Sequence, residues 1–429
     1  MARVGYCPIQ EMGRRADDLY RRLGRSRPLT AAELASQGRV STAGVMIQDV
    51  VGDVRAFKDT ETGASANCTC RYVGTHCYVY VGDDQISNAE AVAMGQFFDE
   101  TIYPKAHAYF GSEWNPGIDG DSHVYVVFSS LANGNAYFDA SNEYPISADN
   151  SFSNLKEMVM IDGRMSFPQF GPMTFEDLKG IVAHEFQHLV RWSTKLQGSS
   201  FTGIDAPSSR DKGVNEGCSQ LMECLVGYGY RYGPTFSVAS RSQNLKEYLE
   251  STESVSLSGH ERGGARFYSA GLLAVLYLVD HFGPDSEVLP RLGASDGRVG
   301  MDSLAAASGL RASDFFDRLA WALRFAATPG MDPAYTFRSI DLTGRTQYAG
   351  TPLHAAWACM SNLGPADYAQ GWDLSRSAWT TPNTAALLEW APQFHRFYNG
   401  RGQTLEIELA DLKPSGAGGG DVSVYLLCR

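Results

Sequence analysis

Residues 180–190 read GIVAHEFQHLV and are the most informative stretch of the sequence. His184 and His188 are four positions apart, and an α-helix brings side chains at that spacing onto one face. Two imidazoles on one helical face can bind the same divalent cation, and Glu185 lies beside them, placed to take a proton from an attacking water. The segment therefore predicts a zinc site of the kind that metal-dependent hydrolases use.

The sequence around this motif predicts an amphipathic helix. Thr174 is placed to cap its N-terminus, and Glu176 and Asp177 follow in the first turn, where the helix dipole favours acidic side chains. The alternative is a pair of ordinary helix histidines bonded to neighbours, but two imidazoles left unpaired on a buried face are costly. The apolar positions of the helix are Phe175, Leu178, Ile181, Val182, Phe186, Leu189 and Val190.

A catalytic zinc ion usually takes a third protein ligand, and residues 214–223, VNEGCSQLME, provide the best candidate. Glu216 is the predicted ligand on a second helix, and Glu223, seven positions on, shares its face. We expect Asn215 and Glu223 to support the site, Glu223 by orienting a histidine through its other nitrogen. Gly217 would let this helix approach the histidine helix closely. A solvated helix residue is the alternative for Glu216.

His-Glu-x-x-His followed by Asn-Glu-Gly on a later helix resembles the gluzincins, zinc peptidases whose third ligand is glutamate. More narrowly, the chain resembles the hyicolysin-type bacterial neutral metallopeptidases, also at 72–81 (YVGTHCYVYV), 101–104 (TIYP) and 142–145 (NEYP). The resemblance runs from about Arg71 to about Gly283. It implies His184, His188 and Glu216 as zinc ligands and Glu185 as the general base or acid.

The spacing departs from the family pattern. Glu216 follows His188 by 28 positions, which is longer than in thermolysin-like and aminopeptidase gluzincins. The stretches 198–200 (GSS) and 207–209 (PSS) indicate an extended loop that could absorb the difference. Asp205 and Asp211 stay open as alternative third ligands.

A hydrogen-bond donor beside the zinc site would stabilise the oxyanion formed during peptide hydrolysis. Tyr268 opens a predicted helix that ends near residues 280–283, and it looks like the tyrosine that gluzincin aminopeptidases carry at a similar helix start. His260, in the loop 259–262, is the alternative donor. A tyrosine on a helix face can also be simply packed.

Composition limits the classes of function. The chain has 429 residues, 44% of them hydrophobic, and a formal net charge of −12, which argues against nucleic acid and anionic membranes as partners. No apolar run is long enough to span a bilayer. The first residues lack the hydrophobic core of a signal peptide. Either a signal peptide lies outside this sequence or the protein stays inside the cell. Of these we expect the first: a monomeric protein of the bacterial cell envelope or exterior that acts on protein or peptide substrates.

The eight cysteines are an even number, which favours disulfide bonds but does not define their pairing. Cys68, Cys70 and Cys77 cluster, and a thiolate metal site is the alternative there, although no second Cys-x-x-Cys pair completes it. Cys218 and Cys224 lie six apart on one predicted helix and should not pair with each other.

The predicted fold class is α+β: a gluzincin-like zinc peptidase domain, with a mixed sheet and a helical subdomain, followed by an antiparallel β-sandwich. The predicted divisions are residues 1–60 (a pro-region or edge strands), 61–330 (catalytic) and 331–429 (accessory). Strands are expected at 73–81, 123–128 and 157–161, the last as an edge strand beside the cleft, with helices at 89–109 and across 175–327. The sandwich is inferred from alternating segments at 394–398, 404–409 and 422–427.

Two acidic loops, 119–121 (DGD) and 139–143 (DASNE), could bind structural Ca²⁺, although ordinary turn chemistry explains both. The function that these features favour is a zinc endopeptidase. A catalytically inactive zinc-binding scaffold that acts in adhesion is one alternative, but it has no need of Glu185. An aminopeptidase is another, but no acidic anchor motif for a substrate amine is evident.

Overall fold

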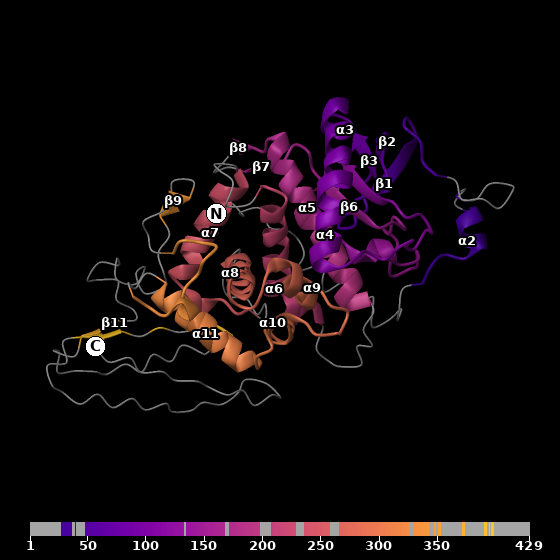
Figure 1. Cartoon of the computed structure of the whole chain (residues 1–429). Coiled ribbons are helices and arrows are strands. Elements are labelled where there is room, and N and C mark those ends of the chain that lie inside the picture. Colours follow the sequence, from indigo (N-terminus) through magenta and orange to yellow (C-terminus); the bar gives the residue numbers. More distant parts are fainter. Residues whose placement is uncertain are drawn as a thin grey trace.

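A computed structural model gives the fold (Figure 1). It describes residues 27–36, 39, 48–132, 134–167, 171–197, 207–228, 236–257, 266–326 and 330–342, and beyond these 347–348, 351–352, 371–373, 390–392, 394 and 396–398. Within them, a mixed sheet and a set of helices form an α+β structure, the coarse fold class that the sequence predicts.

Within the described residues, the main sheet has six strands in the order β1-β2-β3-β4-β6-β5. Its strands are β1 (Val54–Lys58), β2 (Ser65–Val73), β3 (Cys77–Gly82), β4 (Val124–Phe128), β5 (Ala136–Phe138) and β6 (Met158–Ile161). Strands β3, β4 and β6 are parallel to one another, whereas β1, β2 and β5 each run antiparallel to a neighbour. Both faces of β3 are buried, since Val79 packs in the core toward the helices and Tyr80 in a second cluster on the opposite face.

Several predicted elements need correction. The strand predicted at 73–81 is two strands, β2 and β3, which meet at a turn. The strand predicted at 157–161 exists as β6, but it lies between β4 and β5 and is not an edge strand. The edge position belongs to β5, a strand of three residues that is too short to show a sequence period. The prediction of a strand at 123–128 is confirmed by β4.

Most of the remaining elements are helices. The helix predicted at 89–109 is α3 (Asn88–Phe97) and α4 (Tyr103–Phe110), joined through the π-helical turn Phe98–Ile102. The later helices are α5 (Phe175–Arg191), α6 (Pro207–Leu225), α7 (Phe236–Leu249), α8 (Arg266–His281), α9 (Asp285–Leu292), α10 (Gly300–Ser308) and α11 (Ala312–Phe325), which confirms the helical region. The described part also contains helix α2 (Ala31–Ser36) and the short helical turns Ala140–Glu143, Trp192–Gln197, Thr252–Ser254 and Pro333–Tyr335. Its two-residue strands are β7 (Ser166–Phe167), β8 (Gly171–Pro172), β9 (Gln347–Tyr348) and β10 (Thr351–Pro352).

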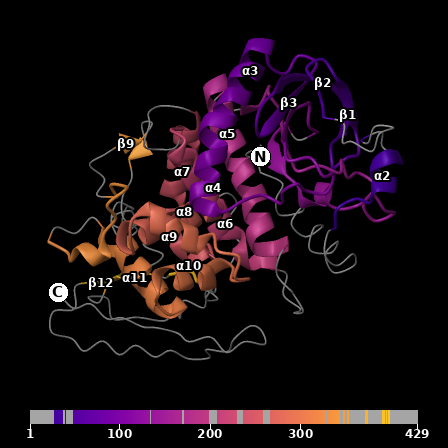
Figure 2. The same ribbon diagram turned by 45° about the vertical axis from the view of Figure 1, so that its right-hand side comes forward.

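Helix α5 lies between the sheet and the later helices, with β5 and β6 on one side and α6 on the other (Figures 1 and 2). Its start is the predicted one: Thr174 Oγ1 accepts from the Asp177 amide at 3.2 Å, and the Asp177 carboxylate accepts from the Thr174 amide at 2.9 Å. This reciprocal cap satisfies backbone donors that the first turn of a helix leaves without intrahelical partners. The sequence thereby sets the register of α5 and the direction of its histidines.

Helices α6 and α8 pack unusually closely, through glycines. A Cβ atom added to Gly271 of α8 would lie 1.7 Å from the Gly213 carbonyl oxygen, and one added to Gly217 would lie 2.3 Å from the Gly271 backbone. Gly217 therefore serves the contact of α6 with α8. The expectation that it serves the contact with the histidine helix is wrong, because a sequence period shows which face a residue is on but not which helix covers that face.

The variant Gly271→Ala is expected to unfold at a lower denaturant concentration than the wild type. Its free energy of unfolding should fall by about 3 kcal/mol, because the backbone atoms of α6 cannot move aside unless the whole helix moves. The measurement is equilibrium unfolding followed by circular dichroism. Gly180→Ala on α5 is the matched control, since its Cβ would meet only the half-buried side chain of Tyr228, at 3.0 Å. Equal midpoints for the two variants would contradict the close-packing argument.

The predicted accessory domain lies mostly outside the described residues. Among its described strands, β9 and β10 pair antiparallel, whereas β11 (Gly371–Asp373) and β12 (Arg396–Tyr398) pair in parallel, in contrast to the antiparallel arrangement expected. The segments 404–409 and 422–427 are not among the described residues. Within the predicted N-terminal segment, β1 pairs with β2 as an edge strand of the main sheet. The domain boundaries and the sandwich stay predictions.

The cysteines of the described part form no disulfide, so the structure does not support the expected disulfides among Cys68, Cys70, Cys77, Cys218 and Cys224. Cys68 and Cys70 pack on the outer face of the sheet and Cys77 on the inner one, which separates the suggested thiolate cluster. The other three cysteines lie outside the described residues. Among the described helices, none has the length and apolarity needed to cross a bilayer.

Candidate metal centre

Helix α5 places His184 and His188 side by side on its buried face. Their ring centroids are 4.8 Å apart, and the side chains are 3% and 2% exposed. The face that carries them is turned toward α6, so both rings point into the interior between two helices. Imidazoles that are buried this deeply need partners for both nitrogen atoms.

Helix α6 brings a carboxylate to the same point. Glu216 is fully buried, and its Oε2 lies 3.2 Å from His184 Nε2 and 3.5 Å from His188 Nε2. One candidate ligand atom from each of the three residues lies within 4.8 Å of the other two. Within the described ranges, this is the one group of three histidine, cysteine or acidic side chains that is close enough to hold a metal ion.

The electrostatics of the cluster suit a cation. In the described part of the chain, neither oxygen of Glu216 has a well-formed hydrogen bond, a costly state for a buried carboxylate. Burial alone would raise the pKa of Glu216, but the two imidazoles outweigh burial and hold it far below the usual range. Burial would likewise lower the pKa of His184, yet the carboxylates of Glu216 and Glu223 raise it to about 9. The pocket therefore favours positive charge at its centre.

The outer nitrogen of each histidine is held by α6. His184 Nδ1 lies 2.6 Å from Glu223 Oε1, and His188 Nδ1 lies 3.0 Å from Asn215 Oδ1. The Ser219 hydroxyl is also 3.0 Å from His188 Nδ1. Partners on Nδ1 fix the ring orientation and leave the Nε2 atoms facing Glu216, which is how proteins commonly orient histidine ligands of a metal.

This donor set fits zinc. Two imidazole nitrogens and one carboxylate are a common protein ligand set of catalytic zinc, in which a fourth position is left for water or substrate. The residues that the sequence singles out as ligands, His184, His188 and Glu216, are those that the fold brings together. Asp211, an alternative ligand, instead forms a bidentate ion pair with Arg191, with both N–O distances at 2.5 Å. Asp205 lies outside the described residues.

Glu185 lies next to this cluster in a second buried environment. Its Oε2 accepts a hydrogen bond from the backbone N–H of Phe138, in β5, at 3.0 Å. Burial raises the pKa of Glu185, an effect that the neighbouring imidazoles oppose. A carboxylate whose pKa is shifted toward neutrality and whose position is fixed by a backbone donor is suited to accept a proton.

Of the two predicted oxyanion donors, Tyr268 and His260, the structure describes only Tyr268. The ring of Tyr268, near the start of α8, stacks beside His184 with 6.4 Å between centroids and 27° between planes. It is 6% exposed. The tyrosine therefore lies at the edge of the candidate centre. His260 lies outside the described residues.

Some residues of the centre were not foreseen. Ser219 contacts His188, Gln187 accepts a hydrogen bond from Ser219, and the Phe138 amide holds Glu185. A signal for Ser219 exists: Asn215, Ser219 and Glu223 recur every four residues and so share a face of α6. No side-chain pattern could have revealed Phe138, because it acts through its backbone.

The two acidic loops suggested for calcium have partners of their own. In the first, Asp119 pairs with Lys156, and Asp121 accepts from Arg39 at 3.0 Å. In the second, the Asp139 side chain caps the helical turn Ala140–Glu143 by accepting from the Ser141 amide at 2.9 Å. These contacts favour the turn interpretation, and calcium binding stays a prediction.

Comparison with known proteins gives one informative similarity. No family model matches the sequence. Over 196 residues, the chain is 24% identical to the neutral metalloprotease ShpI of Staphylococcus hyicus, which corresponds to 42% of this chain and 41% of that protein. The chain thus spans about two fifths of the length of this relative. The similarity supports a metalloprotease-like relationship and nothing narrower.

Among solved structures, a functionally unknown conserved protein from Bacillus anthracis str. Ames is similar over 57% of this chain and 47% of its own, with 12% identity and a TM-score of 0.32. At that TM-score, the similarity carries no argument about function.

Proposed function

We propose that this protein is a zinc-dependent endopeptidase that hydrolyses peptide bonds within proteins. The observation that carries the proposal is the buried convergence of His184, His188 and Glu216, with Glu185 beside it. The similarity to a neutral metalloprotease supports the same class of reaction. The proposal assigns a role to each of the four side chains.

His184, His188 and Glu216 would hold the zinc ion, which supplies Lewis acidity toward a peptide carbonyl and lowers the pKa of water. Glu185 accepts the proton of the attacking water on its carboxylate and delivers it to the nitrogen of the departing amine. The Phe138 N–H holds the Oε2 atom of Glu185 and so fixes the position of the carboxylate. The raised pKa of Glu185 makes it a better proton acceptor than an exposed glutamate.

Edge strand β5 would bind the substrate backbone. Among the described strands, β5 (Ala136–Phe138) pairs with β6 and ends the sheet, and Phe138 contacts Glu185 directly. An extended peptide laid along such an edge forms backbone hydrogen bonds that do not depend on its sequence. The substrate-binding role expected for 157–161 therefore passes to β5. Tyr268, stacked beside His184, is the proposed oxyanion donor.

Metal analysis combined with a chelation assay tests the proposal. The purified protein should contain about one zinc ion per chain and should hydrolyse casein. Treatment with 1,10-phenanthroline should abolish hydrolysis, and added zinc should restore it. The assay is a time course of casein fragments, with metal measured by atomic absorption.

The possible outcomes separate the alternatives. Zinc binding without hydrolysis of casein or short peptides would favour the inactive scaffold. Release of N-terminal residues alone, without internal cleavage, would favour an aminopeptidase. Hydrolysis that survives complete metal removal would refute metal-dependent catalysis altogether.

A further inference from the structure

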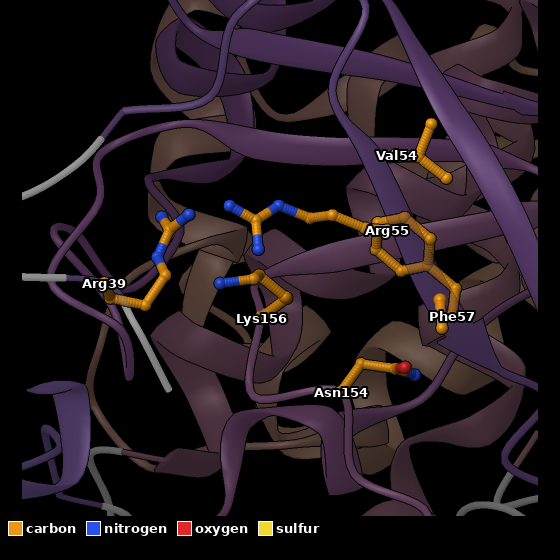
Figure 3. A pocket seen from close by; sticks show the side chains of 7 residues that line it. Arg39, Val54, Arg55, Phe57, Asn154 and Lys156 are labelled. Carbon is orange, nitrogen blue, oxygen red and sulfur yellow. The ribbon is translucent and has the colours of Figure 1, made fainter. Parts of the chain in front are cut away.

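A cavity of about 320 Å³ lies beside β1, on the side of the sheet turned away from the candidate metal centre. Its lining residues are Arg39, Val54, Arg55, Ala56, Phe57, Asn154 and Lys156. Figure 3 shows the charged ends of Arg39, Arg55 and Lys156 gathered in one place, with Val54 and Phe57 to one side. The cavity is thus mainly polar, with a cationic end and a smaller apolar side.

The three cations are held in place by acids behind them. Asp49 accepts from Arg39 at 2.7 Å and from Arg55 Nε at 2.8 Å, while Lys156 donates to Asp119. The side chains of Arg39 and Lys156 are only 2% and 6% exposed. Such buried cations are ordered by their partners before any ligand arrives, which lowers the entropy cost of binding.

Not all of the donors are used by these acids. Arg39 Nε is buried and has no hydrogen-bond partner within the described part of the chain. Lys156 Nζ carries three hydrogens; it donates to Asp119 and lies 4.8 Å from the centroid of the Tyr125 ring. Leaving a buried donor unpaired costs free energy that an acceptor in the cavity would recover.

The charge balance selects the kind of acceptor. Arg39 also pairs with Asp121, so three cations face three carboxylates, those of Asp49, Asp119 and Asp121. His123 Nδ1 lies 2.6 Å from Asp121 and adds a positive charge when it is protonated, so the cluster is formally neutral or carries one positive charge. That balance suits an anion of one charge better than a phosphate dianion. The cavity lies near the lower end of the usual size range of ligand sites, which suits a small molecule or chain end.

We infer that this cavity is a binding site for a small monocarboxylate, whose charge meets Arg39, Arg55 and Lys156 and whose apolar part lies against Val54 and Phe57. Two sources present this chemistry: a free short-chain carboxylic acid, and the carboxyl terminus of a peptide. The site is separate from the metal centre and does not depend on the proposed peptidase activity.

Ligand-observed NMR with the full chain tests the inference. Butyrate should bind saturably at neutral pH, whereas butyramide, of nearly the same shape but uncharged, should bind at least about tenfold more weakly. A short acetylated peptide with a free carboxyl terminus, compared with its amidated form, distinguishes the second source from the first. Equal binding of charged and uncharged forms in both pairs would overturn the inference, as would the absence of saturable binding of either acid.

Two substitutions locate the binding. Val54→Glu introduces a negative charge at an exposed lining residue and should weaken binding of the acid by about tenfold. Val54 is 61% exposed, so the fold should tolerate the change. The matched control is Val73→Glu, at an exposed position that does not line the cavity. Carboxylate binding that is unchanged in Val54→Glu would overturn the assignment.

Arg55→Gln is a second, independent test of the carboxylate site. It removes a cation from the cavity, while Asp49 keeps hydrogen bonds from Arg39 and Tyr80. Binding of the acid should fall by about tenfold or more, and binding of butyramide should not change. Zinc content is measured in every variant, because unchanged zinc separates a failure of this site from a failure of the proposed metal centre.

Discussion

Glu185→Gln is expected to keep its zinc and lose its proteolytic activity. Glutamine has nearly the shape of glutamate, and its side-chain oxygen can still accept from the Phe138 amide. The side-chain amide of glutamine cannot take up a proton at neutral pH, however, so the proton transfer assigned to Glu185 fails. General base catalysis contributes about 10²–10⁴-fold to a rate, and kcat/KM should fall by at least that factor.

The measurement is kcat/KM on a fluorogenic peptide that the wild-type protein cleaves, together with zinc content after dialysis. Glu176→Gln is the matched control: it makes the same change on the same helix, at a side chain 55% exposed. Activity of Glu185→Gln within a few-fold of that control would remove Glu185 from the mechanism. Loss of zinc in Glu185→Gln would instead show that the residue holds the site together.

The parts of this centre that could be predicted from sequence are those set by neighbours along one helix. The spacing of His184 and His188 and the cap formed by Thr174 and Asp177 depend on contacts within a few residues. Glu216 could be proposed because its own helix has a readable period. Local geometry of this kind is the same in any fold that contains the helix.

The parts that escaped prediction depend on contacts between distant segments. The Phe138 amide reaches Glu185 across 47 positions, from a strand too short to show a period. Gly217 was assigned to the wrong neighbouring helix because its packing partner, Gly271, is fixed only by the tertiary fold. The cationic cavity gathers Arg39, Arg55 and Lys156 from distant parts of the chain, and no local pattern marks them as neighbours.

Glu216→Gln should lose most of its zinc while remaining folded. The substitution preserves the volume of the side chain at a fully buried position, so it creates no cavity, but it removes the negative charge that lies between two imidazoles. Loss of a residue that only supports a metal ligand typically weakens metal affinity by about 10–100-fold, and loss of a ligand should exceed that. Glu216→Ala should lose zinc as well, with additional destabilisation from the space it leaves.

Zinc affinity is measured by competition with a chromophoric chelator, and folding by circular dichroism. Glu223→Gln gives the intermediate case, because it leaves all three proposed ligands in place and weakens only the hold on His184 Nδ1. Glu247→Gln, at an exposed position of α7, is the control for replacing a glutamate by glutamine away from the metal centre. The expected order of zinc affinity is wild type and Glu247→Gln, then Glu223→Gln, then Glu216→Gln. If Glu216→Gln binds zinc as tightly as Glu223→Gln, the carboxylate of Glu216 is not a ligand, and the third ligand must come from another part of the chain.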